Sequence, residues 1–171
     1  MKVDNNNRDD SAESNADPPL EQAFLAPTPV IHFGILVLSI ILAVLIPIQL
    51  FSRGVANILG IGIFGSGIIM MRWFFQTMRR NGAPVAYRAE ESKLVTDGPF
   101  QYSRNPMYLA IVLFHAGLAC LVNALGFALV LPVHILVMQY GVIRHEERHL
   151  ERVFGEQYRT YKTQVHRWIG L

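Results

Sequence analysis

Three long stretches without a charged side chain dominate this sequence. They cover residues 30–51, 54–71 and 105–143. An α-helix rises about 1.5 Å per residue, so about 20 apolar residues cross the roughly 30 Å hydrocarbon core of a bilayer. The first two stretches are therefore long enough to cross a membrane once each. The third would overshoot it about twofold as a single helix, so it must fold back on itself.

Turn-forming residues around Val122-Asn123-Ala124-Leu125-Gly126 favour a very tight hairpin within the third stretch. The sequence therefore predicts an all-α integral membrane protein with about four transmembrane helices and a C-terminal amphipathic helix. The expected spans are residues 30–51, 55–75, 106–121 and 124–143. A loop over 80–105 would connect the second and third spans, and the C-terminal helix would cover 144–165. Residues 26–171 would form one membrane domain.

The composition agrees with this class of protein. Hydrophobic residues make up 51% of the 171 residues and charged residues only 16%, which is unusual for a soluble domain of this length. Six of the 13 acidic residues and two of the 15 basic ones lie among the first 21 positions, in a polar context. Residues 1–25 are therefore expected to form a disordered tail without the apolar core of a signal peptide. Cys120 is the single cysteine, so an intrachain disulfide and a CxxC pair are excluded.

Basic residues are distributed unevenly around the predicted spans. The connection over residues 72–104 carries six arginines and lysines and the segment after residue 143 carries six more, whereas the two opposite loops offer only Arg53. By the positive-inside rule, the connection and both termini are expected in the cytoplasm.

Two polar segments flank the predicted hairpin. The first reads "LVTDGPFQYSRNPMYLA" from Leu94, in which Asp97-Gly98-Pro99 indicates a turn and Asn105-Pro106 a helix start. The second reads "EERHLERVFGEQYRTYKTQVHRWI" from Glu146. Polar segments of this kind at a membrane boundary are where the functional residues are expected.

Together the two segments resemble the isoprenylcysteine carboxyl methyltransferase family and its bacterial relatives. The family pattern is L-V-x-x-G-P-Y-x-x-x-R-[HN]-P-x-Y, then a Glu-Glu pair, then F-G-x-x-Y-x-x-Y, and the likeness covers about residues 92–169. It implies a membrane enzyme that transfers a methyl group from S-adenosylmethionine to a carboxylate or another nucleophile. The acceptor would be lipid-like or prenylated, and no nucleic acid would be bound.

The resemblance also implies which residues form the site. The cofactor would be held by residues of both segments, namely Ser92, Lys93, Leu94, Val95, Phe100, Asn105, Pro106, Met107, Tyr108, Glu146 and Glu147. Arg144, or as second choice Arg104, would orient an acidic substrate, because a guanidinium can bind a carboxylate with two hydrogen bonds. No metal is implied.

Two positions depart from the family pattern. Asn105 stands where the eukaryotic enzymes have His, so a mechanism with a titrating base at this position is in doubt. Phe100 replaces the usual Tyr, which keeps the ring and removes a hydroxyl.

Other functions fit parts of the same sequence. His145, Glu146 and His149 spell H-E-x-x-H, the signature of a zinc peptidase, although no third ligand stands in a recognisable motif. A membrane reductase of the sterol-reductase type, using NADPH, shares a similar C-terminal layout. A non-catalytic membrane scaffold gives no reason for polar motifs on both sides of the hairpin.

Several of these residues also have a purely structural interpretation. Glu147, Glu151 and Arg152 are expected on a solvated helix face. Tyr158, Tyr161 and Trp168 suit anchors at the membrane interface as well as substrate contacts. His115 and His134 either line a polar cavity or bond to each other across the hairpin. The small pair Gly62 and Ser66 is expected to allow close helix packing.

Overall fold

The computed structural model describes residues 28–82 and 93–169, and within these all regular elements are helical. The sequence has α2 (Thr28–Leu45), α3 (Arg53–Arg80), the 3₁₀ turn η2 (Gly98–Gln101), α4 (Pro106–Val122) and α5 (Leu125–Val137). A π-helical segment, η3 (Met138–Ile143), continues α5 into α6 (Arg144–Phe154), and α7 (Glu156–Gln164) follows. The expected all-α class is confirmed. The expected tail over residues 1–25 lies outside the described residues.

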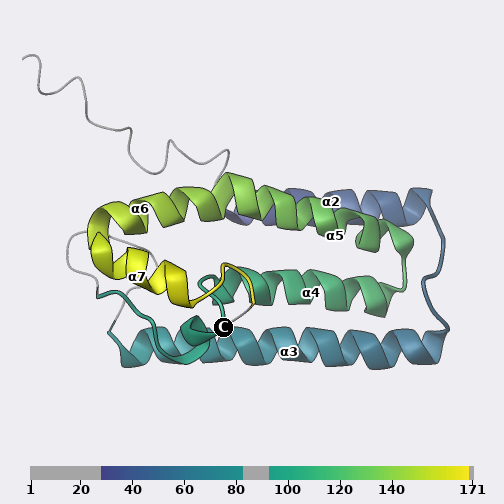
Figure 1. The fold of residues 1–171 in the computed structure, drawn as a ribbon. Helices are drawn as coiled ribbons and strands as arrows, with labels where there is room; N and C mark the ends of the chain where they lie inside the picture. The colour runs from purple at the N-terminus through teal and green to yellow at the C-terminus, as the bar shows by residue number, and fades with distance from the viewer. Residues whose placement is uncertain (1–27, 83–92, 170–171) are drawn as a thin grey trace, which may run out of the picture.

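The helices form an elongated bundle in which neighbours pack in the order α2, α5, α4, α3 (Figure 1). Three helical stretches, Thr28–Leu45, Arg53–Arg80 and Leu125–Phe154, are long and apolar enough to cross a membrane, and Pro106–Val122 is a shorter apolar helix. Large hydrophobic side chains on α2 and α3 are exposed, such as Val44 at 74% and Ile58 at 75%. Exposed apolar side chains on spans of this length are suited to lipid rather than water.

The bounds of two expected helices need correction. The span expected over residues 30–51 ends at Leu45, because Pro47 has no backbone N–H and disfavours helix in the residue before it. The single helix expected over residues 144–165 is two helices, with a break at Gly155, whose φ is +53°. Glycine has no Cβ, so it adopts a positive φ at little steric cost, and this backbone ends the helix.

The hairpin between α4 and α5 is as tight as expected, with only Asn123 and Ala124 between the helices. Asn123 has a φ of 55°, in the left-handed region that asparagine tolerates. Its amide accepts hydrogen bonds from the Leu50 and Phe51 N–H groups at 3.1 and 3.0 Å and donates to the Phe51 carbonyl at 2.8 Å. Asn123 thereby joins the α4–α5 turn to the α2–α3 connection at one end of the bundle.

Three histidines from three helices form a hydrogen-bonded chain inside the bundle. His115 Nε2 lies 3.0 Å from the Phe127 carbonyl oxygen, which can only accept, so this nitrogen donates. His134 bridges the other two rings, at 3.1 Å from His115 Nδ1 and 3.1 Å from His32 Nδ1. Of the two interpretations of His115 and His134, the structure has the hydrogen bond across the hairpin, and His32 extends it to α2.

Small residues bring α3 and α4 close together, but the expected pair is the wrong one. A Cβ on Gly60 or Gly67 would lie 2.6 or 2.8 Å from α4 side-chain atoms, whereas Gly62 faces open space and Ser66 is exposed. The close contact therefore uses the opposite face of α3 from the pair Gly62 and Ser66.

We expect Asn123→Ala to lower the free energy of unfolding by about 2–4 kcal/mol, because three hydrogen bonds are lost at about 0.5–1.5 kcal/mol each. Denaturant unfolding of the detergent-solubilised protein measures this change. Asn123→Gly, which loses the same bonds but accepts the positive φ, should be destabilised less. Equal stability of wild type and both variants would contradict this role.

Candidate active site

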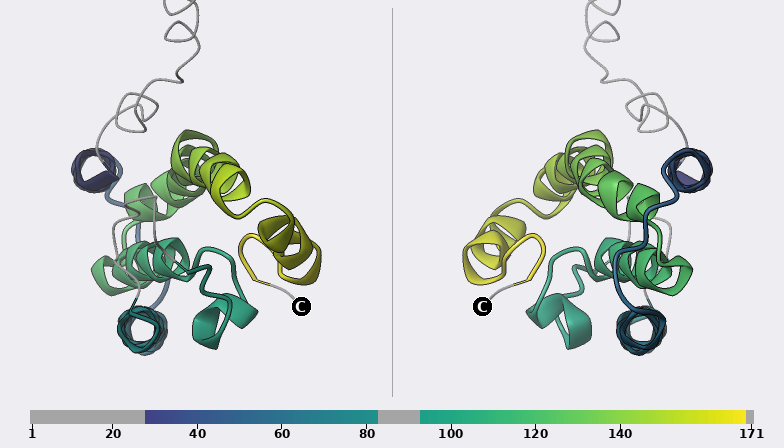
Figure 2. Two further views of the ribbon diagram at one scale, coloured as in Figure 1. Left: turned by 90° about the vertical axis from the view of Figure 1, so that its left-hand side faces the viewer. Right: turned by 90° about the vertical axis from the view of Figure 1, so that its right-hand side faces the viewer.

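The predicted site residues gather at the end of the bundle opposite the α4–α5 turn. There the last turns of α3, the segment over residues 93–105, the start of α4 and the helix α6 converge (Figures 1 and 2). A hydrophobic cluster packs between these elements and α7. It consists of Phe74, Met78, Val95, Phe100, Tyr158, Tyr161 and Val165.

A small cavity of about 60 Å³ lies between these elements. Its wall combines apolar and aromatic side chains with a few polar groups: Phe74, Met78, Phe100, Arg104, Asn105, Pro106, Met107, Tyr108, Glu146 and Leu150. Two segments that are 38 residues apart in the chain therefore share one cavity, as the family resemblance implies. Tyr108 Oη donates a hydrogen bond to Glu146 Oε1 at 2.6 Å across it.

Glu146 lies beyond the membrane-spanning part of its helix. The α5–α6 stretch is 30 residues long, or about 45 Å, which exceeds the hydrocarbon core. All its charged residues belong to α6, starting at Arg144. Burial raises the pKa of the Glu146 carboxyl to about 7, the Tyr108 hydrogen bond opposes this, and the charge of Glu147 adds to it. A carboxyl that titrates near neutrality in a cavity is a functional-site signal.

Arg104 contributes a cation to the same wall. Its guanidinium is largely buried, and Nε has no hydrogen-bond partner among the described residues. The cavity therefore holds one acidic group, one cation with spare donors, and flanking aromatic rings.

Not all the predicted cofactor residues line the cavity. Val95 is buried in the supporting cluster, Leu94 packs against it, and Lys93 is exposed. Ser92 lies outside the described residues. Glu147 does not line the cavity, and its carboxylate pairs with Arg104 and Arg167.

A second cleft of about 600 Å³ lies next to the cavity, and Glu147 of its wall pairs with Arg104 of the cavity wall. Its wall consists of Tyr140, Arg144, Glu147, Arg148, Glu151, Lys162 and Arg167. The Arg144 guanidinium stacks over the Tyr140 ring, 4.3 Å from its centroid. The two arginines predicted to bind substrate thus lie in different places, with Arg104 at the cavity and Arg144 in the cleft.

Several structural interpretations from the sequence are wrong at this end of the protein. Glu147 is 6% exposed and carries an ion pair, so it is not on a solvated face. Tyr158 and Tyr161 are 2% and 6% exposed core residues rather than interfacial anchors. The expectation of a solvated face is met by Glu151, which pairs with Arg159 and Lys162 near the surface.

The structure adds two residues that the sequence patterns did not indicate, Arg167 and Gln139. Arg167 bonds to Glu147, and Gln139 Oε1 accepts a hydrogen bond from Trp168 Nε1 at 2.8 Å. The partners are 20 and 29 residues apart in the chain, so local spacing does not reveal either contact. His145 and His149 do not gain a third ligand: within residues 28–82 and 93–169, no group of three His, Cys, Asp or Glu side chains is placed to hold a metal ion.

Comparison with known proteins places the chain in a family. Residues 55–157, more than half of the chain, match the family model described as phospholipid methyltransferase. The chain belongs to this family, which is one of the integral-membrane methyltransferase families related to the isoprenylcysteine carboxyl methyltransferases. The family assignment from the sequence is therefore confirmed.

Two curated proteins are similar over shorter stretches. The cobalt-zinc-cadmium resistance protein CzcN of Cupriavidus metallidurans is 34% identical over 67 residues, which is 39% of this chain and 31% of that protein. An uncharacterized protein of Haemophilus influenzae is 41% identical over 64 residues, which is 37% of this chain and all of that protein. The matched part thus spans about a third of the length of CzcN.

We expect Tyr108→Phe to raise the pKa of Glu146 above about 7, because the phenol hydroxyl stabilises the ionised carboxylate by hydrogen bonding. Infrared difference spectra of the carboxyl C=O band across a pH series, with Glu146→Gln to identify the band, measure this pKa. Tyr140→Phe removes a phenol hydroxyl outside the cavity and should leave the band unchanged. A Glu146 pKa unaffected by Tyr108→Phe would contradict the proposed contact.

Proposed function

We propose that this protein is a membrane methyltransferase that uses S-adenosylmethionine to methylate a lipid-like acceptor. The observation that carries the proposal is the cavity shared by Tyr108 and Glu146, in a chain of the phospholipid methyltransferase family. This combination favours methyl transfer over the reductase and peptidase alternatives.

The side chains around the cavity fit the chemistry of the cofactor. S-adenosylmethionine carries an ammonium and a sulfonium, which an ionised Glu146 would neutralise, and a carboxylate, which the spare Arg104 donors would bind. Phe74, Phe100 and Met107 would flank the adenine. The cavity of about 60 Å³ is below the roughly 300 Å³ at which ligand pockets begin. Cofactor binding must therefore move these walls apart.

The protein's contribution to such a reaction is alignment and the exclusion of water. The cofactor would supply a methyl group on a sulfonium: a nucleophile of the acceptor would bond to the methyl carbon as the carbon–sulfur bond breaks, and S-adenosylhomocysteine would leave. No covalent enzyme intermediate is needed. Glu146 and Arg104 would fix the amino-acid end of the cofactor, and the apolar residues Met107 and Leu150 would keep water from the reacting atoms.

The second cleft is proposed to hold the acceptor. The Arg144 guanidinium is held in place by the Tyr140 ring and offers two parallel donors to a carboxylate or phosphate at the membrane boundary. An amphiphile would thereby place its polar group near α6 while its chains stay in the lipid. The excess of basic residues at this end supports a cytoplasmic orientation for the site and both termini.

The proposal is tested most simply by a transfer assay. Protein in liposomes made from the lipid extract of a membrane should incorporate radioactive methyl groups from S-adenosylmethionine into a lipid-soluble product. Arg144→Gln should retain cofactor binding and lose transfer, because Arg144 lines the cleft proposed for the acceptor and not the cavity proposed for the cofactor. Absence of any labelled product with several lipid extracts would contradict the proposal.

We expect Glu146→Gln to weaken S-adenosylhomocysteine binding by about tenfold or more, because a charge-assisted hydrogen bond is worth about 1.5–3 kcal/mol. Isothermal titration calorimetry of the solubilised protein measures the affinity. Glu156→Gln, on an exposed carboxylate of α7, is the matched control and should bind like wild type. Equal affinity of the Glu146 variant and wild type would remove Glu146 from the site.

Cofactor binding should also depend on pH. The pKa of Glu146 is raised to about 7, so the carboxyl is neutral at pH 5.5 and attracts an ammonium only when it ionises. We expect the affinity for S-adenosylhomocysteine to rise as the pH increases through about 7. The same titration with Glu146→Gln should be flat over this interval; a pH dependence shared by both proteins would contradict the assignment.

A further inference from the structure

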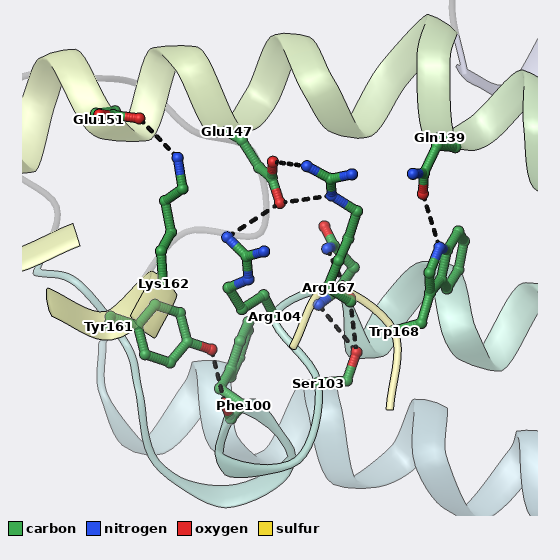
Figure 3. Close-up of polar contacts among 11 residues, drawn as sticks. Phe100, Ser103, Arg104, Gln139, Glu147, Glu151, Tyr161, Lys162, Arg167 and Trp168 are labelled. Atoms are coloured by element: carbon green, nitrogen blue, oxygen red, sulfur yellow. Dashed lines mark hydrogen bonds and ion pairs between the residues drawn. The ribbon is translucent and has the colours of Figure 1, made fainter. Parts of the chain in front are cut away.

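The carboxylate of Glu147 is the centre of a three-residue ion cluster. Its Oε1 accepts a hydrogen bond from Arg167 Nε at 2.9 Å and lies 3.2 Å from Arg104 Nη1, and its Oε2 pairs with Arg167 Nη2 (Figure 3). Glu147 is 6% exposed. Removing one member of a buried ion pair is strongly destabilising, because the other charge is left buried without a partner.

Arg167 belongs to a segment that is bonded to two elements of the site. We call residues 165–169 the C-terminal strap. Its backbone accepts hydrogen bonds from the Arg104 N–H at His166 O (3.0 Å) and from Asn105 Nδ2 at Arg167 O (2.9 Å). On its other side Trp168 donates to Gln139 of η3. The strap therefore joins the start of α4 to the α5–α6 helix. Both elements contribute residues to the wall of the cavity.

The cluster has an unbalanced charge. Two guanidiniums share one carboxylate, which leaves one net positive charge, and of the two arginines Arg104 is the more buried, at 10% side-chain exposure against 26% for Arg167. Arg104 is the member that lines the cavity, and its Nε has no partner among the described residues. A buried cation with a free donor favours an anion beside it.

We infer that Glu147 is a positioning residue: it fastens the C-terminal strap to α6, so that the strap holds the start of α4 and α6 together at the cavity, and it keeps Arg104 ready for an anionic group. This inference rests on the proposed function, in which that group is the carboxylate of the cofactor. Glu147 acts through the two arginines and does not touch the cofactor. Release of the strap lets the cavity widen, and its closure retains the bound cofactor.

Glu151 provides an internal comparison on the same helix. It lies one turn after Glu147 and also binds two cations, Arg159 and Lys162, at 3.0 and 2.9 Å. Its side chain is 31% exposed and neither partner belongs to the strap. Ion pairs of this exposed kind contribute little, so Glu151→Gln removes a similar pair without opening the strap.

The experiment measures dissociation of S-adenosylhomocysteine from the full-length solubilised protein by stopped-flow displacement. Glu147→Gln and Arg167→Gln should each release it about tenfold faster or more than wild type. Arg167→Lys, which keeps the charge, should recover part of the effect, and Glu151→Gln should stay within about twofold of wild type. Thermal unfolding of each variant is recorded beside it, because a purely structural role would lower the melting temperature without changing the dissociation rate.

The outcomes separate the two claims. The inference about the strap is wrong if the Glu147 and Arg167 variants release the cofactor product at the wild-type rate. It is also wrong if Glu151→Gln accelerates release equally. Either result leaves the proposed function intact. Failure of the wild-type protein to bind S-adenosylhomocysteine would overturn the proposed function and the inference with it. If Glu147→Gln does not fold, Trp168→Phe tests the strap at its other contact, and an unchanged dissociation rate there counts against it.

Discussion

The hairpin of α4 and α5 is the constraint on which the site depends. In a bilayer the backbone must satisfy its own hydrogen bonds, so a long apolar segment can only reverse as two helices joined by a short turn. The two arms, Pro106–Val122 and Leu125–Ile143, have 17 and 19 residues, and at about 1.5 Å per residue their lengths nearly match. Their outer ends therefore meet at the same membrane boundary. This equality places Tyr108 beside Glu146.

Polar chemistry concentrates where that hairpin ends. Inside the bundle, three histidines are linked by hydrogen bonds, and residues 105–143 contain no Asp, Glu, Lys or Arg. Beyond the apolar part, Glu146 and Glu147 follow each other on α6 but point to different neighbours. One meets a phenol in a cavity and titrates near neutrality; the other binds two arginines. Adjacent carboxylates on one helix thereby acquire different tasks, because successive residues face different directions.

The sequence predicted the features that follow from length and local chemistry. Apolar runs specify spans, the Asn123 turn specifies the reversal, and Pro106 specifies where α4 begins. The pairing of the two motifs followed from the hairpin. Pro47 and Gly155 carried local signals for the ends of α2 and α6, but the expected helices ran through both positions.

What the sequence could not predict depends on distant packing. Glu147 has the spacing of a solvated helix face, and only the approach of Arg104 and Arg167, 43 residues before it and 20 after, turns it into a buried ion centre. His32 joins His134 across 102 residues. Which glycines of α3 touch α4 depends on the rotation of one helix against another, and several faces of α3 carry small residues.

Photo-crosslinking of radioactive S-adenosylmethionine to the solubilised protein, followed by mass-spectrometric mapping, tests the central claim most directly. If one cavity between the two motifs holds the cofactor, labelled peptides should come from both residues 100–108 and residues 146–150, and excess unlabelled S-adenosylhomocysteine should suppress both together. Label confined to one of these peptides, or found only elsewhere in the chain, would contradict the account.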